Sequence, residues 1–354
     1  MSTYNVKEFD IFIGIDVDQS SYSFTVKDHE NMNQSKKIPA NFETFYNYLN
    51  HHHAGQKILC AYEVGGTGYG LHDYLTDKHI SCLMVSPQTV AKPGNDKVKN
   101  NRLDSVKIAT QLRNGDLPNV RIACGIFRDL RQGVRSREDY VSSRKIAKQT
   151  IKALLLFANL HKVIKDDTVH WSGSYIQQLK DIPCPLAIRQ RLNALLEDLT
   201  YARKQNLRTL KELRNFCKDN PELQRNIDYL KSIPGIGFIV AVTILANIGD
   251  PRHLRHPQEL AGFIGLTPRE YSTGDKIIKG RISHMGNAVL RSLLVESAWI
   301  AKGRDVRLEQ FYQRIRKKHS NVFASQKAIV AVARKMTLII YRVLKDQRAY
   351  EVRS

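Results

Sequence analysis

The sequence has few features of a secreted or membrane-bound protein. Its 354 residues include only five cysteines, none paired at the spacing of metal ligands, so neither a disulfide framework nor a zinc site is expected. No apolar run reaches the roughly 18 residues that a membrane span needs. The N-terminal residues also lack the basic and then apolar layout of a signal peptide. We therefore expect reduced thiols, no membrane segment and a location in the cytoplasm.

Acidic residues are scarce beside basic ones. The chain has 55 lysines and arginines against 34 aspartates and glutamates, a formal net charge of +21. The first 90 residues sum to −4, whereas the last 54 hold 14 bases and 4 acids. A basic protein of this kind most often neutralises phosphates, although a solubility surface or a nonspecific anion patch is the alternative. An acidic block ahead of a basic remainder fits a carboxylate-rich metal site inside a nucleic-acid-binding protein.

Residues 1–125 alternate between strand and helix patterns. Residues 9–27 are typical of two strands joined by a tight turn, and two further apolar runs, 57–64 and 81–86, also predict strands. Helical spacing of apolar residues occurs over 41–53 and 101–113. Since strands that alternate with helices build layered sheets, we predict an α/β domain over residues 1–125.

After residue 126 the pattern becomes helical. Apolar residues three and four apart run through 126–160 and 186–217, which predicts two long amphipathic helices, either an antiparallel pair or an intermolecular coiled coil. We assign residues 126–228 to this helical segment. The remainder, residues 229–354, opens with the loop and buried helix of SIPGIGFIVAVTILANIG and ends in basic helices, so a mainly α domain is predicted there.

Three carboxylates lie where an α/β sheet would bring them together. Asp16 closes the first strand, Glu63 ends a buried strand, and Asp104 lies on the helix opened by KNNRLDS. Strand-end carboxylates converge at one sheet edge, and their repulsion favours a divalent cation such as Mg²⁺, which takes oxygen ligands and, as a pair of ions, supports phosphoryl transfer. Asn101 adds an amide oxygen on the same side of the helix as Asp104. Taken singly, each acid is more simply a surface residue or a helix cap, but the set predicts a Mg²⁺ site.

The hydroxyl-rich stretch EYSTGDKIIKGRISHMGN is a second candidate. Ser272 and Thr273 precede a glycine there. A hydroxyl that attacks phosphate needs a permissive backbone and nearby cations for the developing charge. The cations that follow are Lys276, Lys279 and Arg281. Ser-Thr-Gly is more simply a turn, so both interpretations stay open at this point.

Other residues are candidates for phosphate contacts. Gly235 and Gly237 lie in a PGIG turn that resembles the hairpin of helix–hairpin–helix modules, whose backbone N–H groups bind phosphate; a plain turn between helices is the alternative. Basic residues of the helical stretch 126–152 and of the last 54 residues are also expected to hold phosphates. These are Arg131, Arg135, Lys145, Lys148, Lys317 and Lys318.

In this order, the motifs resemble those of transposases of the bacterial insertion-sequence family numbered one-hundred-ten, and more closely its eleven-eleven subgroup. GIDV, YEVGGTGYGL and KVKNNRLDSVKIATQLRNG are similar to its N-terminal Asp-Glu-Asp-Asp domain. SIPGIG, ELAGFIGLTPREYSTG and KGRISHMGNAVLRSLLVESAW are similar to its C-terminal transposase domain. Each motif alone is loose, whereas the ordered set covers nearly the whole chain.

The resemblance implies a RuvC-like, ribonuclease-H-type N-terminal domain, a coiled-coil middle and a C-terminal domain with a serine nucleophile. It implies a Mg²⁺-dependent recombinase that joins an insertion element to target DNA through a covalent phosphoserine link. It also implies a structured noncoding guide RNA and a bacterial, nucleoid-associated protein. Because the hydroxyl motif lies far in sequence from the carboxylates, we expect a homo-oligomer, a dimer or tetramer, with a composite site.

Two positions depart from the pattern of the family. Its third acidic position falls on Asn101, which removes one negative charge and could shift that role to Asp96 or to backbone oxygen. Its serine falls on Thr273, with Ser272 one place earlier. The less hindered primary hydroxyl favours Ser272 and the alignment favours Thr273, so either can be the nucleophile.

Two rival functions follow from the same residues. One is a Holliday-junction-type nuclease that cuts by metal-activated water and leaves both hydroxyls structural. The other is a nonenzymatic nucleic-acid-binding protein, which the loss of an acid at position 101 would allow. A covalent protein–DNA adduct distinguishes the recombinase from the first rival, and metal-dependent strand cleavage excludes the second.

Overall fold

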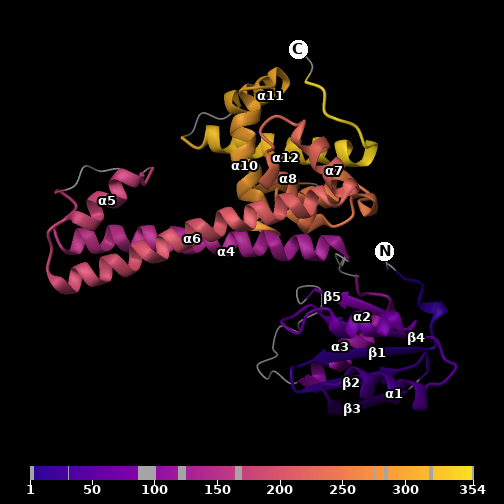
Figure 1. The fold of residues 1–354 in the computed structure, drawn as a ribbon. Coiled ribbons are helices and arrows are strands. Elements are labelled where there is room, and N and C mark those ends of the chain that lie inside the picture. The colour runs from indigo at the N-terminus through magenta and orange to yellow at the C-terminus, as the bar shows by residue number, and fades with distance from the viewer. Residues whose placement is uncertain are drawn as a thin grey trace. The chain divides into compact units, whose positions relative to one another are not determined.

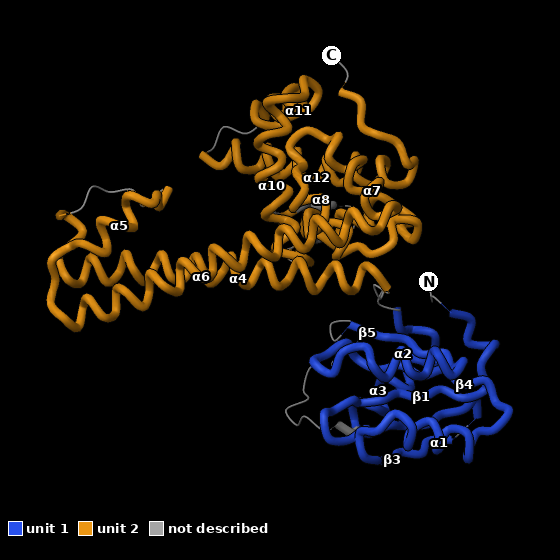
Figure 2. The backbone as a smooth tube through the Cα atoms, viewed as in Figure 1, with its two compact units in different colours: residues 1–122 blue, residues 123–354 orange. Residues whose placement is uncertain are grey.

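The computed structural model describes residues 4–30, 32–86, 101–118, 125–163, 170–273, 276–282, 286–318 and 322–352 (Figure 1). The chain divides into two compact units, residues 1–122 and 123–354 (Figure 2). The boundary lies close to the end of the α/β domain that the sequence predicts. The further division of the second unit at residue 228 stays a prediction.

The first unit contains a five-stranded mixed sheet in the order β3–β2–β1–β4–β5. Its strands are β1 (Ile11–Val17), β2 (Ser21–Lys27), β3 (Asn33–Pro39), β4 (Ile58–Glu63) and β5 (Ser81–Val85). β2 pairs antiparallel with both β1 and β3, while β4 is parallel to β1 and to β5. The helices of the unit are α1 (Phe42–His52), α2 (Gly70–Asp77) and α3 (Asn101–Asn114), and a 3-10 turn, Val6–Glu8, precedes β1. This arrangement is the ribonuclease-H-like one that the resemblance implies.

The two faces of the sheet are covered by different helices. Ile13 and Ile15 of β1 share an apolar cluster with Phe45 of α1 and Leu75 of α2. Side chains alternate between the faces of a strand, so Phe12, which clusters with Ile108 and Leu112 of α3, belongs to the opposite face. Gly14 and Asp16 lie on this second face, the one that α3 covers.

Gly14 allows α3 to lie directly on β1. A Cβ built on Gly14 would lie 2.3 Å from the Ser105 carbonyl oxygen and 2.3 Å from the Ala109 backbone nitrogen. The hydroxyl of Ser105 also lies 2.8 Å from that of Thr25 on β2, with both residues buried. These contacts fix the position of α3 along the sheet. Its later residue, Leu112, clusters with Phe12, so the N-terminal end of the helix points toward the Asp16 end of β1.

The second unit is built on two long helices, α4 (Ile126–Phe157) and α6 (Leu186–Lys218), which pack side by side (Figure 1). Leu130 near the start of α4 shares a cluster with Leu213 near the end of α6. Ile151 near the end of α4 shares another with Leu192 near the start of α6. The pair is therefore antiparallel within one chain, and that alternative of the two predicted from the sequence is confirmed.

The remaining elements of the second unit are α5 (Gly173–Asp181), α7 (Pro221–Lys231), α8 (Phe238–Ile248), the 3-10 turn Pro251–His253, α9 (Pro257–Ile264), β6 (Pro268–Thr273), β7 (Lys276–Ile282), α10 (Ala288–Lys302), α11 (Val306–Lys317) and α12 (Ala324–Asp346). α8 is apolar along almost its whole length and is mostly buried. It shares one large apolar cluster with residues of α4, α6, α7 and α10 to α12. This cluster is the core of the mainly α region that the sequence predicts.

The sequence patterns do not predict every element. β3 has the polar sequence NQSKKIP and is almost entirely exposed, so it lacks the apolar alternation that identifies a strand; its lysines and final proline are typical of a protected sheet edge. The β6–β7 hairpin is predicted from the sequence only as a turn. Within the described ranges, we find no helix with both the length and the apolar character that a bilayer crossing requires.

Candidate functional site

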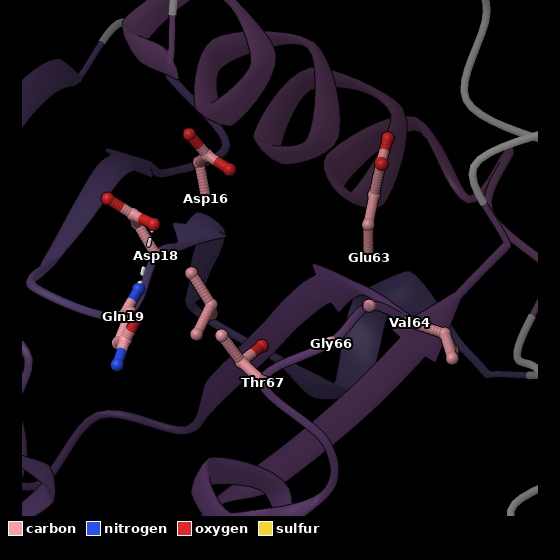
Figure 3. Close-up of a pocket in the computed structure, with 9 residues that line it drawn as sticks. Asp16, Asp18, Gln19, Glu63, Val64, Gly66 and Thr67 are labelled. Carbon is pink, nitrogen blue, oxygen red and sulfur yellow. Dashed lines mark hydrogen bonds between the residues drawn. The ribbon is translucent and has the colours of Figure 1, made fainter. Parts of the chain in front are cut away.

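Asp16 and Glu63 lie beside each other at one edge of the sheet in the first unit. β1 and β4 pair in parallel with Gly14 opposite Ala61 and Ile15 opposite Tyr62, so Asp16 and Glu63 come next along the two strands. Both residues are half-buried. Figure 3 shows both carboxylates extending to the same side, away from the loop of Gly66 and Thr67. The structure therefore brings together two of the three predicted carboxylates.

The loops that follow β1 and β4 form a pocket around this carboxylate pair. The pocket has a volume of about 800 Å³ and is lined by Asp16, Val17, Asp18, Gln19, Glu63, Val64, Gly65, Gly66 and Thr67 (Figure 3). Gly65 and Gly66 line it without crowding, since no atom lies within 3.4 Å of a Cβ built on either. Asp18 accepts hydrogen bonds from the Gln19 backbone N–H (2.8 Å) and the Ser20 hydroxyl (3.2 Å), which orders the loop after β1.

Asp18 and Thr67 line the pocket but are not among the site residues predicted from the sequence. Asp18 lies one residue beyond β1, and Thr67 lies in the glycine-rich loop after Glu63. Asp18 could have been predicted from the sequence, since it lies two residues after Asp16 at the end of the same strand. Nothing in the sequence marks Thr67.

Asp104 lies on α3, whose N-terminal end points toward the same sheet edge. Its carboxylate Oδ1 is 3.6 Å from Nζ of Lys107, and both side chains are partly exposed. Asp104 is not among the residues that line the pocket. The side chain of Asn101, the first residue of α3, and all of Asp96 lie outside the described residues. Among the residues that are described, no three His, Cys, Asp or Glu side chains form a group able to hold a metal ion.

Ser272 and Thr273 lie on the β6–β7 hairpin of the second unit. Ser272 pairs with Ile277 and Thr273 with Lys276 across the turn, and Lys279 and Arg281 belong to β7. The hairpin thus places the backbone of the hydroxyl residues next to that of the first cation. The side chains of residues 270–279 and 281 lie outside the described part of the chain, so the two hydroxyls remain alternatives.

The PGIG turn joins α7 to α8, and its glycines have different surroundings. Gly235 has a φ of +84° and packs against α10, where an added Cβ would lie 2.3 Å from the Ser297 carbonyl oxygen. Gly237 is the N-cap of α8, and no atom lies within 4 Å of a Cβ built there. Gly235 therefore serves the packing of the turn, whereas Gly237 leaves the helix N-terminus accessible.

The predicted phosphate-binding bases fall into two groups. Arg131 is half-buried, and its guanidinium donates to the backbone carbonyls of Ala246 (2.8 Å) and Asn247 (3.1 Å) at the C-terminal end of α8. This gives Arg131 a role in the fold, which the charge pattern alone does not reveal. Lys148 is half-buried as well, and the exposed group consists of Arg135, Lys145, Lys317 and Lys318.

Two family comparisons agree with this architecture. A transposase family model for the Asp-Glu-Asp-Asp domain of IS110-type elements matches residues 13–159, and the model of the "Transposase IS116/IS110/IS902 family" matches residues 227–313. Together they cover well over half of the chain, and the first match extends beyond the first unit into α4 of the second. The chain belongs to the IS110 family of transposases. It is therefore an enzyme of DNA phosphoryl transfer, which excludes the nonenzymatic interpretation.

Curated relatives of the transposase extend the match along the chain. The protein y4qE of Sinorhizobium fredii, a transposase by name, is 27% identical over 327 residues, which is 88% of this chain and 75% of the relative. The transposase of the insertion element IS1111A of Coxiella burnetii is 27% identical over 276 residues, 77% of this chain and 73% of the relative. The pilin gene-inverting protein of Moraxella bovis is 33% identical over 135 residues, 38% of this chain and 41% of that protein.

The Asp-Glu-Asp-Asp domain of the transposase implies a divalent metal, and the pocket residues fit one. Hard divalent cations take oxygen ligands from carboxylates, carbonyls and water. Asp16 and Glu63 supply two adjacent, half-buried carboxylates, and Asp18 and Thr67 add further oxygens to the same lining. The described residues of the lining include no thiol or imidazole donor, which suits a hard cation better than zinc.

Proposed function

We propose that Asp16, Glu63 and Asp104, with the Asn101 amide, hold Mg²⁺ and that the transposase uses it to cut, exchange and rejoin DNA strands. The observation that carries this proposal is the adjacency of Asp16 and Glu63 at the carboxyl edge of β1 and β4. Two carboxylates at one end of neighbouring strands repel each other, and a cation between them would offset that repulsion. When bound, the metal supplies charge stabilisation at the scissile phosphate.

The strand exchange is assigned to a hydroxyl of Ser272 or Thr273. Its oxygen forms a bond to phosphorus while the bond from phosphorus to a sugar oxygen breaks, and the hydroxyl proton ends on the departing sugar oxygen. The energy of the phosphodiester is kept in the new bond, so strands can be rejoined without a nucleotide cofactor. Lys276, whose backbone pairs with Thr273, and the nearby Lys279 and Arg281 are the cations proposed to offset the developing charge.

The partners follow from the same proposal. The nucleic acid is DNA with the junction of the element and its target, and we propose a structured noncoding RNA as the guide that selects them. A homo-oligomer would let the hydroxyl motif of one copy act with the carboxylates of another, since the two motifs lie in different units of the chain. The basic side chains Arg135, Lys145, Lys317 and Lys318 are proposed to hold the backbone phosphates.

A covalent adduct tests this proposal. The purified transposase is incubated with Mg²⁺, labelled DNA carrying the joined element ends, and RNA transcribed from the flank of the element, and is then resolved on a denaturing gel. Wild type should give a protein–DNA adduct that protease removes. Of the variants Ser272→Ala and Thr273→Ala, one should bind DNA normally and form no adduct. If wild type and the double variant Ser272→Ala/Thr273→Ala both cleave DNA and neither forms an adduct, metal-activated water replaces the hydroxyl as the attacking group.

A further inference from the structure

Four cations crowd together where α4 packs against α6. Arg144, Lys148 and Lys152 are spaced four residues apart on α4, so they form one stripe on that helix. Arg203 of α6 is close enough to Arg144 and Lys148 to influence both electrostatically. Arg144, Lys148 and Lys152 belong to the basic helical stretch 126–152 that is expected from the sequence to hold phosphates, whereas Arg203 is not among the expected residues. Arg203 joins the three cations of α4 only through the pairing of the two helices.

Trp171, which lies just before α5, contacts two of these cations. Its indole ring is 5.3 Å from Nζ of Lys148, and its backbone carbonyl accepts a hydrogen bond of 2.8 Å from the Arg203 guanidinium. The ring is buried and packs edge-on against Tyr175 of α5, with centroids 5.4 Å apart. Trp171 thus holds two of the cations in fixed positions from a rigid, apolar base.

The backbone of Trp171 is strained in a way that serves these contacts. Its φ is +55°, a left-handed conformation that is uncommon for a bulky residue. Unfavourable backbone conformations persist where surrounding contacts over-determine them, and they cluster at ligand-binding sites. Here the turn directs the carbonyl to Arg203 while the ring stays under Lys148, so the strain is coupled to the arrangement of the cations.

The charges around this group do not balance within the chain. Partial burial lowers the pKa of Lys148, and the neighbouring charges of Arg144, Arg203 and Lys152 lower it further. Burial and Arg144 likewise lower the pKa of Arg203. None of the four cations forms an ion pair with a carboxylate in the described part of the chain, whereas Arg208, five residues beyond Arg203, is paired with Glu212 at 2.8 Å. An anion from outside the chain would offset this repulsion.

We propose that Arg144, Lys148, Lys152 and Arg203, held by Trp171, form a binding site for the phosphodiester backbone of nucleic acid. The repeating, closely spaced charges of such a backbone match a stripe of cations along a helix, and a guanidinium binds phosphate oxygens through paired donors. The indole is covered by Lys148 and buried, so it supports the cations and does not stack on a base. The site is therefore selective for the backbone and indifferent to base sequence.

This site rests on the binding of nucleic acid by a transposase and is independent of the proposed metal and hydroxyl chemistry. Both the element DNA and a guide RNA would present the same phosphodiester chemistry. The experiment must therefore offer both nucleic acids and must measure binding separately from strand cleavage.

The test compares Lys152→Gln and the double variant Lys148→Gln/Lys152→Gln with Arg208→Gln in the full chain. Arg208→Gln is the matched control, because it removes an exposed cation of α6 that already has a carboxylate partner. Fluorescence anisotropy with duplex DNA of the element ends, and with single-stranded RNA from the element flank, is measured over a range of KCl concentrations without divalent metal. Thermal unfolding is recorded for each variant without nucleic acid.

The double variant should bind about tenfold or more weakly than wild type. Its log–log salt slope should become shallower by roughly 0.9 for each DNA phosphate that is no longer neutralised, or by roughly 0.7 for each RNA phosphate. Its melting temperature should stay the same or rise, because a repulsive cluster has been relieved. Weaker binding of DNA only, of RNA only or of both supports the site and shows which nucleic acid supplies the phosphates that it binds.

Affinity and salt slope equal to those of Arg208→Gln for both nucleic acids would overturn the proposal. Lys152 is exposed, so Lys152→Gln is expected to stay folded. If the double variant unfolds, Lys152→Gln is compared with Arg208→Gln in its place.

Discussion

Gly14 of β1 lies directly against the backbone of Ala109 on α3. An added Cβ would be 2.3 Å from the Ala109 nitrogen, so no side chain fits without displacing the helix. Asp16 follows Gly14 on the same face of the strand. Asp104 lies on α3, the helix that packs against Gly14. The contact between one glycine and one helix turn therefore sets where the helix carboxylate lies relative to the strand carboxylates.

The first prediction concerns this contact. Gly14→Ala should lower the free energy of unfolding of the first unit by about 1–3 kcal/mol, the usual result of overpacking a close contact. The shift of α3 should also reduce DNA cleavage beyond what the loss of folded protein explains. Gly262→Ala on α9 is the control, since a Cβ there meets no atom within 4 Å. Equal stability of the two variants in urea unfolding would contradict the account.

The second prediction separates two arginines of α4 that the charge pattern treats alike. Arg131 donates to two carbonyls at the end of α8, so Arg131→Gln should destabilise the second unit by about 1–3 kcal/mol, the cost of leaving buried acceptors unpaired. Arg135 is exposed, so Arg135→Gln should leave unfolding unchanged and reduce the salt dependence of DNA binding. Destabilisation by Arg135→Gln and unchanged unfolding of Arg131→Gln would contradict the structural role of Arg131.

A third prediction concerns pH and the C-terminal residues. The Tyr350 hydroxyl donates to the buried carboxylate of Asp305 at 2.6 Å. Burial, together with that carboxylate, raises the pKa of Tyr350 from 10 to about 12. The stabilisation is fully present below pH 10, the unfolded value, and is lost as the pH rises toward 12.

Tyr350→Phe should accordingly cost about 1.5–3 kcal/mol at neutral pH, as expected for a hydrogen bond to a charged group, and the difference from wild type should shrink above pH 10. Tyr341→Phe, which removes an exposed hydrogen bond to the Arg255 carbonyl, should change little. A difference between wild type and Tyr350→Phe that is constant from pH 7 to 12 would contradict the role of this phenol.

The sequence predicts the elements whose physical pattern is strong. Ile13 and Ile15 alternate with Gly14 and Asp16 in a buried strand, so the strand and its terminal carboxylate can be predicted together. The apolar spacing of α4 and α6 gives their length, and the structure shows that they pair within the chain. The polar edge strand β3 escapes prediction because its pairing with β2 stabilises it in place of apolar burial.

The site is predictable only in part, because long-range contacts decide it. The adjacency of Asp16 and Glu63 follows from parallel strands, but the loop residue Thr67 enters the pocket only through the path of the folded chain. Gly235 looks like a phosphate-binding turn residue, whereas packing against Ser297 explains it. The grouping of Arg203 with Lys148 depends on the register of two helices, which no local pattern encodes.

The central claim is that the carboxylate pair on β1 and β4 forms a metal-dependent centre for phosphoryl transfer. Asp16→Asn tests it most directly, with Asp28→Asn as the matched control. Asp28 is also a half-buried aspartate of the first unit, but it follows β2, and the pairing of Phe12 with Lys27 places it at the opposite end of the sheet. Strand cleavage of labelled DNA with the joined element ends is measured in Mg²⁺ and in EDTA. The account predicts full Mg²⁺-dependent cleavage by Asp28→Asn and none by a folded Asp16→Asn, whereas near-normal cleavage by Asp16→Asn would contradict it.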